Sequence, residues 1–334
     1  MRLILSDILR QNDNIQLVDT AANGLEAIEK VKQHQPDVVL CDLVMPEYDG
    51  RYVVQQLMRE QPLPVILLSS LDRNHQMAFD ALEEGAFSFI EKPRDKAISN
   101  IRNLSEYISS KIEEAATINP ARLRPQPILP VSHAHTWQQD QRYQIIVIAA
   151  STGGPRAIET ILNKFPSNLP VPIVIIQHMP ANFLESFASR LQNQLPHLRI
   201  RIARDQEPLE PCVYIAPGDA NLKLVKQRQY SRITFSTTME LYDAFNNPSA
   251  DCFLLSAARI FKDKALAVVL TGMGKDGTKG LLAIRDQGGF TIAQDEASAI
   301  VYGMPGHALS QGAIRQVVPL KEIAPYLVGC LELE

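Results

Sequence analysis

A serine, a histidine and an aspartate lie just beyond three separate apolar runs in the second half of the chain. Ser151 directly follows the run 145–150, and His178 and Asp276 come soon after two similar runs farther along. Such runs are typical of buried parallel strands, whose carboxyl ends form the ligand-binding edge of an α/β sheet. Serine, histidine and aspartate together make an activated serine nucleophile. We therefore predict acyl transfer through Ser151, with His178 as the base and Asp276 orienting it.

The residues after Ser151 predict a tight turn at the N-terminus of a helix. Two glycines follow closely, and Pro155 suits the first turn of a helix. Backbone N–H groups at such a turn can stabilise an oxyanion, so we expect this turn or the backbone N–H of Met273 to do so. The G-x-S-x-G pattern of α/β-hydrolases is absent. A serine in this context could instead cap a helix in a phosphate-binding loop.

The other two side chains each have an ordinary explanation when they are taken alone. A histidine at a strand end is usually structural. Asp276 could cap a helix, and the glycines around it could simply form turns. Three strand-end positions that carry the three required groups favour the serine-nucleophile interpretation over these explanations.

A similar arrangement of polar residues occurs in the first half of the chain. Strand and helix patterns alternate there, beginning with an expected strand at 15–18, and this alternation is typical of a doubly wound parallel sheet. Asp42, Ser69 and Lys92 lie at the ends of three later apolar runs. We expect these three side chains to meet at the carboxyl edge of that sheet.

Six segments of the second half carry a resemblance to a known family. They are 150–154, 177–180, 214–218, 270–277, 293–298 and 302–305. Through them the chain resembles the chemotaxis protein-glutamate methylesterases, the CheB family, over roughly residues 141–333. The first half resembles a response-regulator receiver, and residues 42–50 match the loop after its phospho-acceptor. Asn221 and Asn246–Asn247 stand where the family often has His or Arg, which predicts altered contacts in the substrate groove.

The resemblance implies an enzyme that demethylates glutamate γ-methyl esters and deamidates glutamines on chemoreceptors, giving adaptation in bacterial chemotaxis. It implies no cofactor for this catalysis. It also implies that a histidine kinase supplies phosphate to Asp42, that Ser69 is the hydroxyl switch residue and that Lys92 pairs with the phosphate. Phosphorylation is expected to require Mg²⁺ held at Asp42 and to uncover the catalytic face.

Composition and charge exclude several other classes of function. The 334 residues suffice for two domains with separate cores. A net charge of −4 gives no indication of nucleic-acid binding, and no apolar run reaches the roughly 18 residues of a membrane span. The four cysteines are far apart and form no metal or disulfide pattern, which favours buried thiols in a reducing cytoplasm.

We expect two doubly wound α/β domains and a linker. A flavodoxin-like receiver is predicted over 1–106, a proline-rich linker over 107–140, and a Rossmann-like serine hydrolase domain over 141–334. The receiver is expected to lack its first strand, because the segment 2–10 has the apolar spacing of a helix. The acid pair that ends this strand in receivers, and helps to hold Mg²⁺, is then missing from the chain. We therefore interpret the receiver as truncated at its N-terminus. Either the start codon was assigned too late or the receiver is defective, and the intact pattern of the rest of the receiver favours the first explanation.

Two alternative functions stay open on the sequence. The chain could be a phospho-switch module that has lost catalysis, although the presence of Ser151, His178 and Asp276 argues against this. It could also be the same kind of esterase acting in a signalling pathway unrelated to motility. An ester-hydrolysis assay would test the first alternative, and the neighbouring genes would test the second.

Overall fold

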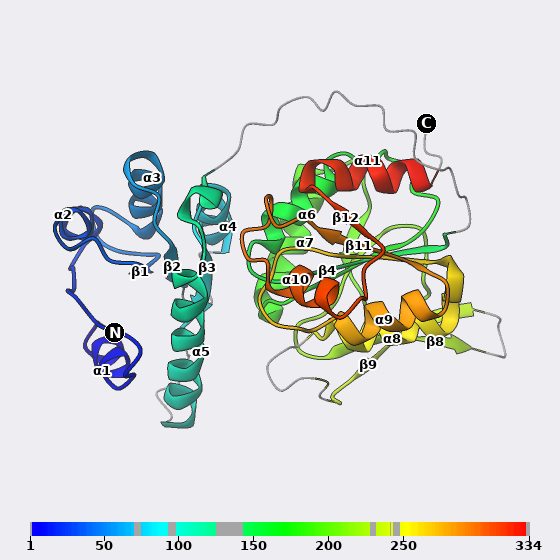
Figure 1. Cartoon of the computed structure of the whole chain (residues 1–334), viewed down its shortest axis with the longest axis horizontal. Helices are drawn as coiled ribbons and strands as arrows, with labels where there is room; N and C mark the ends of the chain where they lie inside the picture. Colours follow the sequence, from blue (N-terminus) through cyan, green and yellow to red (C-terminus); the bar gives the residue numbers. More distant parts are fainter. Residues whose placement is uncertain are drawn as a thin grey trace. The chain divides into compact units, whose positions relative to one another are not determined.

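The chain folds into two compact units, residues 1–127 and 128–334 (Figure 1). The computed structural model describes residues 2–69, 75–92, 98–124, 143–227, 232–240, 242 and 248–331. None of the helices within these ranges is both long and apolar enough to cross a membrane.

The first unit alternates helices with a small parallel sheet. Its elements are α1 (Arg2–Arg10), α2 (Gly24–His34), β1 (Val39–Asp42), α3 (Gly50–Glu60), β2 (Val65–Ser69), α4 (His75–Glu83), β3 (Ser88–Glu91), α5 (Ile98–Ala116) and a 3₁₀ turn, Pro120–Leu123. The strands pair in the order β1-β2-β3, and both pairs are parallel. The central strand, β2, is buried along its whole length, as expected of an α/β sheet.

The segment 15–18 was predicted to be a strand, and this prediction is wrong. Its backbone is irregular, and within the described residues no strand precedes Val39. Helix α1 forms at Arg2–Arg10, as the apolar spacing there predicts. A strand is stabilised by the hydrogen bonds to its neighbours, and no described strand pairs with 15–18. Val18 is accordingly exposed.

The second unit is built around a seven-stranded parallel sheet. Its elements are β4 (Ile145–Ala150), α6 (Gly154–Leu162), β5 (Ile173–Gln177), α7 (Ala181–Gln194), β6 (Ile200–Ile202), β7 (Val213–Ile215), β8 (Asn221–Gln227), β9 (Arg232–Thr238), α8 (Ala250–Phe261), a 3₁₀ turn (Lys262–Lys264), β10 (Ala265–Val269), α9 (Thr278–Asp286), β11 (Phe290–Gln294), α10 (Gly303–Ser310), β12 (Gln316–Val318) and α11 (Leu320–Cys330). The sheet order is β12-β11-β10-β4-β5-β7-β6, and every pair is parallel.

Strand β4 lies at the topological switch point of this sheet. The chain leaves β4 toward β5 on one side and later returns to the other side of β4 with β10. This is the doubly wound arrangement, in which ligands bind at the carboxyl ends of the strands beside the switch point. The fold therefore directs attention to the residues that follow β4, β5 and β10.

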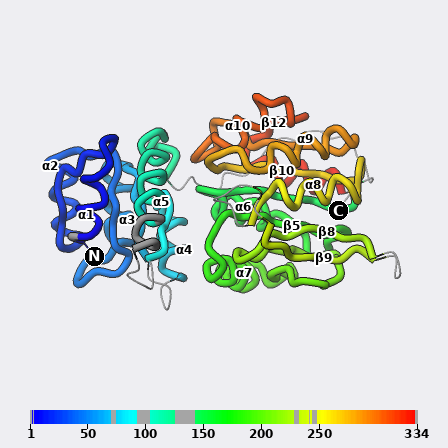
Figure 2. The backbone as a smooth tube through the Cα atoms, turned by 90° about the horizontal axis from the view of Figure 1, so that it is seen from below, coloured from blue at the N-terminus to red at the C-terminus, as the bar shows by residue number. Residues whose placement is uncertain are grey.

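An antiparallel hairpin accompanies the sheet. Strands β8 and β9 run side by side (Figure 2). Residues 228–231, which connect the two strands in the chain, lie outside the described residues. The backbone N–H of Leu224 in β8 donates to Ser256 Oγ at 2.9 Å and so joins the hairpin to helix α8.

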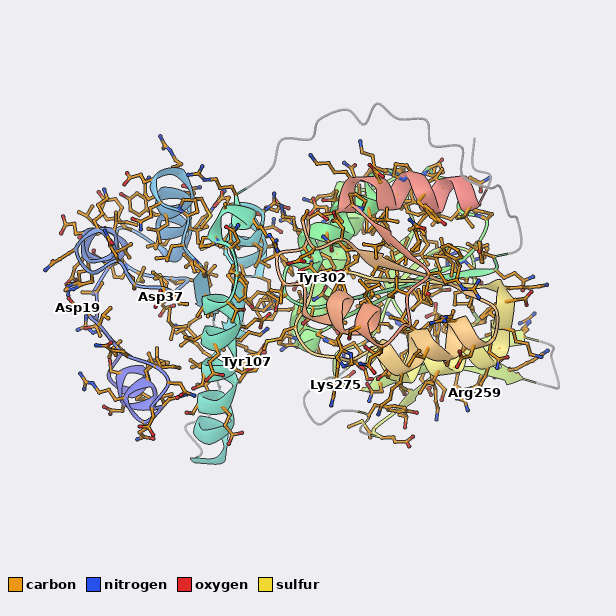
Figure 3. All side chains as sticks on the ribbon, in the orientation of Figure 1. Asp19, Asp37, Tyr107, Arg259, Lys275 and Tyr302 are labelled. Atoms are coloured by element: carbon orange, nitrogen blue, oxygen red, sulfur yellow. The ribbon has the colours of Figure 1, made fainter. Side chains whose placement is uncertain are left out.

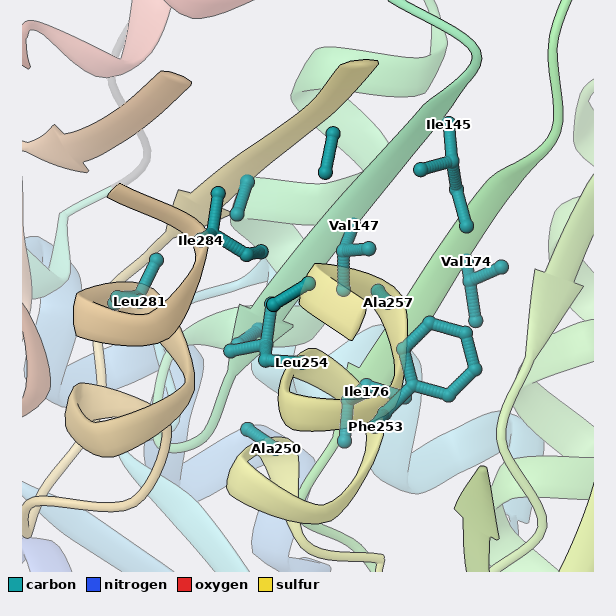
Figure 4. Packing of buried hydrophobic residues seen from close by; sticks show 14 of the residues in the cluster. Ile145, Val147, Val174, Ile176, Ala250, Phe253, Leu254, Ala257, Leu281 and Ile284 are labelled. Carbon is teal, nitrogen blue, oxygen red and sulfur yellow. The ribbon is translucent and has the colours of Figure 1, made fainter. Parts of the chain in front are cut away.

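The core of the second unit includes the contact between the sheet and helix α8. Val147 of β4 lies near Leu254 of α8, and Val174 of β5 lies near Phe253 of α8 (Figure 4); all four side chains are buried. Strands that are covered on both faces must be apolar at nearly every position. This requirement explains why the strands that carry the site can be recognised as apolar runs.

The predicted domain boundaries stay a prediction. Helix α5 continues to Ala116, so the expected linker 107–140 begins inside a helix. Residues 125–140 of that linker lie outside the described part of the chain.

Candidate active site

Strands β10, β4 and β5 are neighbours, and each leads to one of the three predicted side chains. The pairing between them continues past the ends of the strands. The backbone N–H of Ser151 donates to Thr271 O at 3.1 Å, and the N–H of His178 donates to Ala150 O at 3.0 Å. The main chains at Ser151 and His178 are therefore held directly by the sheet.

Ser151 lies on the tight turn between β4 and α6. Its carbonyl accepts a hydrogen bond from the N–H of Gly154 at 2.8 Å. Gly153 has a φ of 78°, in the left-handed region that favours glycine. A Cβ added at Gly272 would lie 2.7 Å from Ser151 Cβ. The loop after β10 thus packs closely against the Ser151 turn.

The imidazole of His178 is bonded to the carboxylate of Asp276. Nε2 lies 2.8 Å from Asp276 Oδ2, so Nδ1 is the ring nitrogen left to exchange a proton with Ser151. Burial raises the pKa of Asp276, but hydrogen bonds from His178 and from the N–H groups of Ala250 and Asp251 outweigh it and hold the pKa below its usual value. Asp276 is therefore an anion that can orient His178 and stabilise its charged form.

The N-terminus of helix α8 is directed at the same carboxylate. Asp276 Oδ1 accepts from Ser249 Oγ at 2.9 Å and from the N–H of Asp251 at 3.1 Å, while Oδ2 accepts from the N–H of Ala250 at 2.6 Å. The partial positive charge at a helix N-terminus favours an anion there. Sequence reasoning missed this contact. Its one signal was Ser249, an N-cap residue before an apolar helix.

Asp251 in α8 in turn accepts a hydrogen bond from the first turn of α9. Its Oδ1 accepts from the backbone N–H of Gly280 at 2.8 Å. Burial raises the pKa of Asp251 to about 6, with a further contribution from the charge of Asp276, although the Gly280 hydrogen bond lowers it. Asp276, just before α9, thus caps α8, while Asp251 in α8 bonds the first turn of α9. This reciprocal arrangement fixes the position of Asp276.

A third segment holds the loop between β10 and α9. Gly272 pairs with Tyr302 in a parallel bridge, and Gly272 O accepts from the N–H of Met304 at 2.7 Å. Figure 3 labels Tyr302 and Lys275, which mark these two segments. The side chain of Met273 is 44% exposed, and its backbone N–H donates to no other described residue. That N–H group is therefore available to a bound ligand.

The first unit brings Asp42, Ser69 and Lys92 together at the carboxyl ends of its neighbouring strands. Lys92 Nζ lies 2.5 Å from Asp42 Oδ2, and the backbone N–H of Lys92 donates to Ser69 O at 2.8 Å. Asp42 Oδ1 accepts from the N–H of Val44 at 3.2 Å. The acid, the hydroxyl residue and the lysine that were predicted at separate strand ends form one cluster.

Two family models cover most of the chain. The model described as CheB methylesterase matches residues 146–327. The chain belongs to the CheB methylesterase family. A second model, described as the response regulator receiver domain, matches residues 1–102. The first model includes Ser151, His178 and Asp276, and the second includes Asp42, Ser69 and Lys92.

Relatives of known name match the chain over nearly its whole length. The protein-glutamate methylesterase/protein-glutamine glutaminase of Pyrococcus abyssi is 37% identical and covers 100% of this chain and 91% of that protein. The protein of the same name from Thermotoga maritima is 37% identical, with 98% and 94% covered. The crystal structure of the Thermotoga maritima CheB methylesterase catalytic domain is 41% identical, with a TM-score of 0.53, and covers 56% of this chain and 97% of that one. The predicted doubly wound α/β fold and the family resemblance are confirmed.

The sequence predicts an incomplete Mg²⁺ site at Asp42, and this stays a prediction. Among them, no group of three His, Cys, Asp or Glu side chains is arranged to hold a metal ion. Asp42 lies at the expected edge of the sheet, but Lys92 is already paired with it. A single carboxylate is a poor ligand set for Mg²⁺.

Asn221 does not line a substrate groove, so the expectation based on its departure from the family is wrong. Its side chain is 1% exposed. Its Nδ2 donates to Glu240 O at 2.7 Å, and its Oδ1 accepts from the backbone N–H of Ser249 at 2.5 Å. Asn221 therefore holds the residue that caps α8. Asn246–Asn247 lie outside the described residues.

Proposed function

We propose that this protein is a phosphorylation-regulated serine hydrolase that removes methyl groups from glutamate γ-methyl esters on chemoreceptors. The observation that carries the proposal is the meeting of three neighbouring strand ends that bear Ser151, His178 and Asp276, with His178 bonded to Asp276 at 2.8 Å. The printed names of the Pyrococcus abyssi and Thermotoga maritima relatives support protein-glutamate methyl esters as the substrate class.

The acylation step begins at the hydroxyl of Ser151. His178 accepts its proton at Nδ1 while Oγ forms a bond to the ester carbonyl carbon. The carbonyl electron pair moves onto oxygen, where the N–H of Met273 and those of the Ser151 turn donate to it. The bond to the methoxy oxygen then breaks, His178 returns the proton, and methanol leaves. Asp276 stabilises the imidazolium that exists between these two proton transfers.

The deacylation step repeats this sequence with water. His178 takes a proton from water, the water oxygen attacks the acyl carbon, and Ser151 leaves with the proton that His178 returns. The product is a glutamate carboxylate. A glutamine γ-amide passes through the same acyl-enzyme with ammonia as the leaving group, so the site also supports deamidation. All proton transfers in this scheme use His178, so it requires no catalytic cofactor.

Regulation is assigned to the first unit. A histidine kinase of the chemotaxis pathway transfers phosphate to Asp42, and Lys92 then pairs with the phosphate. Ser69 is the hydroxyl residue that responds to it. Phosphorylation shifts the population toward an arrangement in which the edge that bears Ser151 is uncovered. The substrate and the kinase are cytoplasmic in this scheme, and the four buried free cysteines suit a reducing compartment.

Methanol release from the methylated cytoplasmic fragment of a chemoreceptor tests the proposal. We expect Ser151→Ala to lower the rate by about 10⁴ to 10⁶, and His178→Ala to be nearly as severe, with both variants folded by circular dichroism. A Ser151→Ala protein that keeps more than about a tenth of the rate would contradict the assignment. Hydrolysis of simple model esters without any activity on receptor esters would favour an esterase of another signalling pathway.

A further inference from the structure

The side chain of Gln177 lies between Ser151, the proposed nucleophile, and His178, the proposed base. Gln177 is the last residue of β5, and its side chain is 1% exposed. Its Nε2 donates to Ser151 O at 3.0 Å and to His178 O at 3.1 Å. A side-chain amide has two N–H groups, and here each binds one of these carbonyls. A single buried amide thus joins the two main chains.

These main-chain contacts determine the spacing of the two side chains. Within the described residues, Ser151 Oγ makes no hydrogen bond to His178, whose Nε2 is occupied by Asp276. What holds the two residues together is the bond from His178 N–H to Ala150 O and the two bonds from Gln177. Because both Gln177 bonds come from one rigid planar group, they fix the distance between the two carbonyls.

The oxygen atom of the same amide indicates that Gln177 does more than stabilise the fold. Its Oε1 is buried and has no hydrogen-bond partner among the described residues, and such an acceptor destabilises a fold. Oε1 lies against Gly154, the first residue of α6, where an added Cβ would be 2.1 Å from it. The partial positive charge at the N-terminus of α6 offsets part of the destabilisation. Glycine at 154 makes the space for the amide.

We propose that Gln177 is a positioning residue whose amide sets the separation of Ser151 and His178 and thereby the rate of proton transfer between them. This inference rests on the proposed function, because that function assigns the nucleophile and the base. Gln177 acts through the main chains and touches neither the substrate nor the transferred proton. Its loss therefore lowers kcat and leaves KM nearly unchanged.

Two variants of Gln177 and one matched control test this role. Gln177→Met keeps the length of the side chain and removes both donors, while Gln177→Glu replaces the donors with oxygen atoms that repel the two carbonyls. The control is Gln192→Met. Gln192 also bonds two backbone groups, Leu198 O at 2.9 Å and the N–H of Ile200 at 2.8 Å. These groups lie at the amino end of β6, the opposite edge of the sheet from Ser151.

Three measurements separate positioning from folding. They are kcat and KM for methanol release, the rate constant for inactivation by phenylmethanesulfonyl fluoride, and the melting temperature. The sulfonyl fluoride reacts with an activated serine, with fluoride leaving, and requires no receptor. We expect each Gln177 variant to lose about 100-fold in kcat and in the inactivation rate constant, the effect of a displacement of about 1 Å. KM should stay within about threefold, and Gln192→Met should match the wild type.

Each outcome shows whether Gln177 positions Ser151 and His178 or serves only the fold. Folded Gln177 variants with wild-type kcat and inactivation rates overturn the proposal, as does an equal loss in Gln192→Met, because the effect would then be general to the fold. Failure of both Gln177 variants to fold also overturns it, since the residue would then serve the fold. A wild-type protein that reacts with the probe but releases no methanol overturns the proposed function instead. The inactivation rates of the variants would still decide the role of Gln177.

Discussion

The carboxylate of Asp276 has a structural role beside the catalytic role that we propose for it. It accepts hydrogen bonds from His178, from the hydroxyl of Ser249 and from the N–H groups of Ala250 and Asp251. A carboxylate buried this deeply stays ionised only when donors surround it, and here they lower its pKa. Because two of the donors belong to the first turn of α8, a change at that helix end is transmitted to the imidazole.

Asp251 supplies a prediction about the pH dependence of stability. Burial raises the pKa of Asp251 from an ordinary value of 3.8 to about 6, so the folded protein holds this proton more tightly than the unfolded chain. The contribution of Asp251 to stability is therefore greatest below about pH 4 and falls as the pH rises to about 6. Asp251→Asn keeps an acceptor for the N–H of Gly280 but cannot ionise. Its melting temperature relative to the wild type should rise between about pH 4 and about pH 7.

Scanning calorimetry at several pH values checks this prediction. A difference in melting temperature that stays constant with pH would contradict it. The pKa of Asp276 is lowered on folding, so its effect on stability has the opposite sign. The stabilisation that Asp276 provides is present above the pKa of the unfolded chain, 3.8, and is lost as the pH falls through the lower pKa of the folded protein. Measurements above about pH 4 therefore isolate the contribution of Asp251.

At the scale of the element, we expect the N-terminus of α8 to affect both stability and the proposed catalysis, through its hydrogen bonds to Asp276. Ser249 Oγ bonds Asp276 Oδ1 at 2.9 Å and accepts from the N–H of Cys252 at 3.3 Å. Ser249→Ala should destabilise the protein by about 1 kcal/mol, as expected for the loss of an N-cap. It should also lower kcat for methanol release about tenfold, because a hydrogen bond to the charged carboxylate is lost.

A serine on the same helix provides the control. Ser256 Oγ accepts from the N–H of Leu224 at 2.9 Å and donates to Phe253 O at 2.7 Å, and it makes no hydrogen bond to Asp276. Ser256→Ala should lower stability, measured by chemical denaturation, by a similar amount without changing kcat. Equal effects of the two substitutions on kcat would show that α8 influences the site only through general stability.

At the scale of the whole molecule, the second unit has its own core and its own seven-stranded sheet. A fragment of residues 141–334 should therefore fold alone. It should release methanol at least as fast as the unphosphorylated full chain, because the proposed cover has been removed. A fragment that is clearly slower than the full chain would mean that the first unit assists catalysis and does not block it.

Phosphorylation of the first unit gives the last prediction. Phosphoryl transfer requires a metal that offsets charge on the phosphoryl oxygens, and among the described residues no group of three His, Cys, Asp or Glu side chains is arranged to hold one. The 334-residue chain should therefore take up phosphate slowly from acetyl phosphate, even with Mg²⁺ present. Asp42→Asn should abolish the phosphorylation that still occurs. Stoichiometric labelling at Asp42, measured by mass spectrometry of the borohydride-reduced protein, would contradict the prediction.

The residues that we propose to carry the chemistry could be located from the sequence because each lies at or just beyond the end of an apolar run. A strand covered on both faces must be apolar, and the first polar residues after it mark its carboxyl end. This reasoning identified Ser151 and His178 in one unit and Asp42 and Lys92 in the other. It failed at 15–18, since a strand also needs a partner, and the local pattern carries no information about whether one is present.

Only the tertiary structure decided which strand ends meet. His178 and Asp276 are 98 residues apart, and nothing in either local sequence requires β5 and β10 to flank β4. The cap that Asp276 places on the N-terminus of α8 and the two hydrogen bonds made by Gln177 were hidden for the same reason. Hydrogen bonds between distant segments depend on how the elements pack. Local sequence determined which side chains follow each strand, and the order of strands in the sheet decided which of these side chains lie near one another.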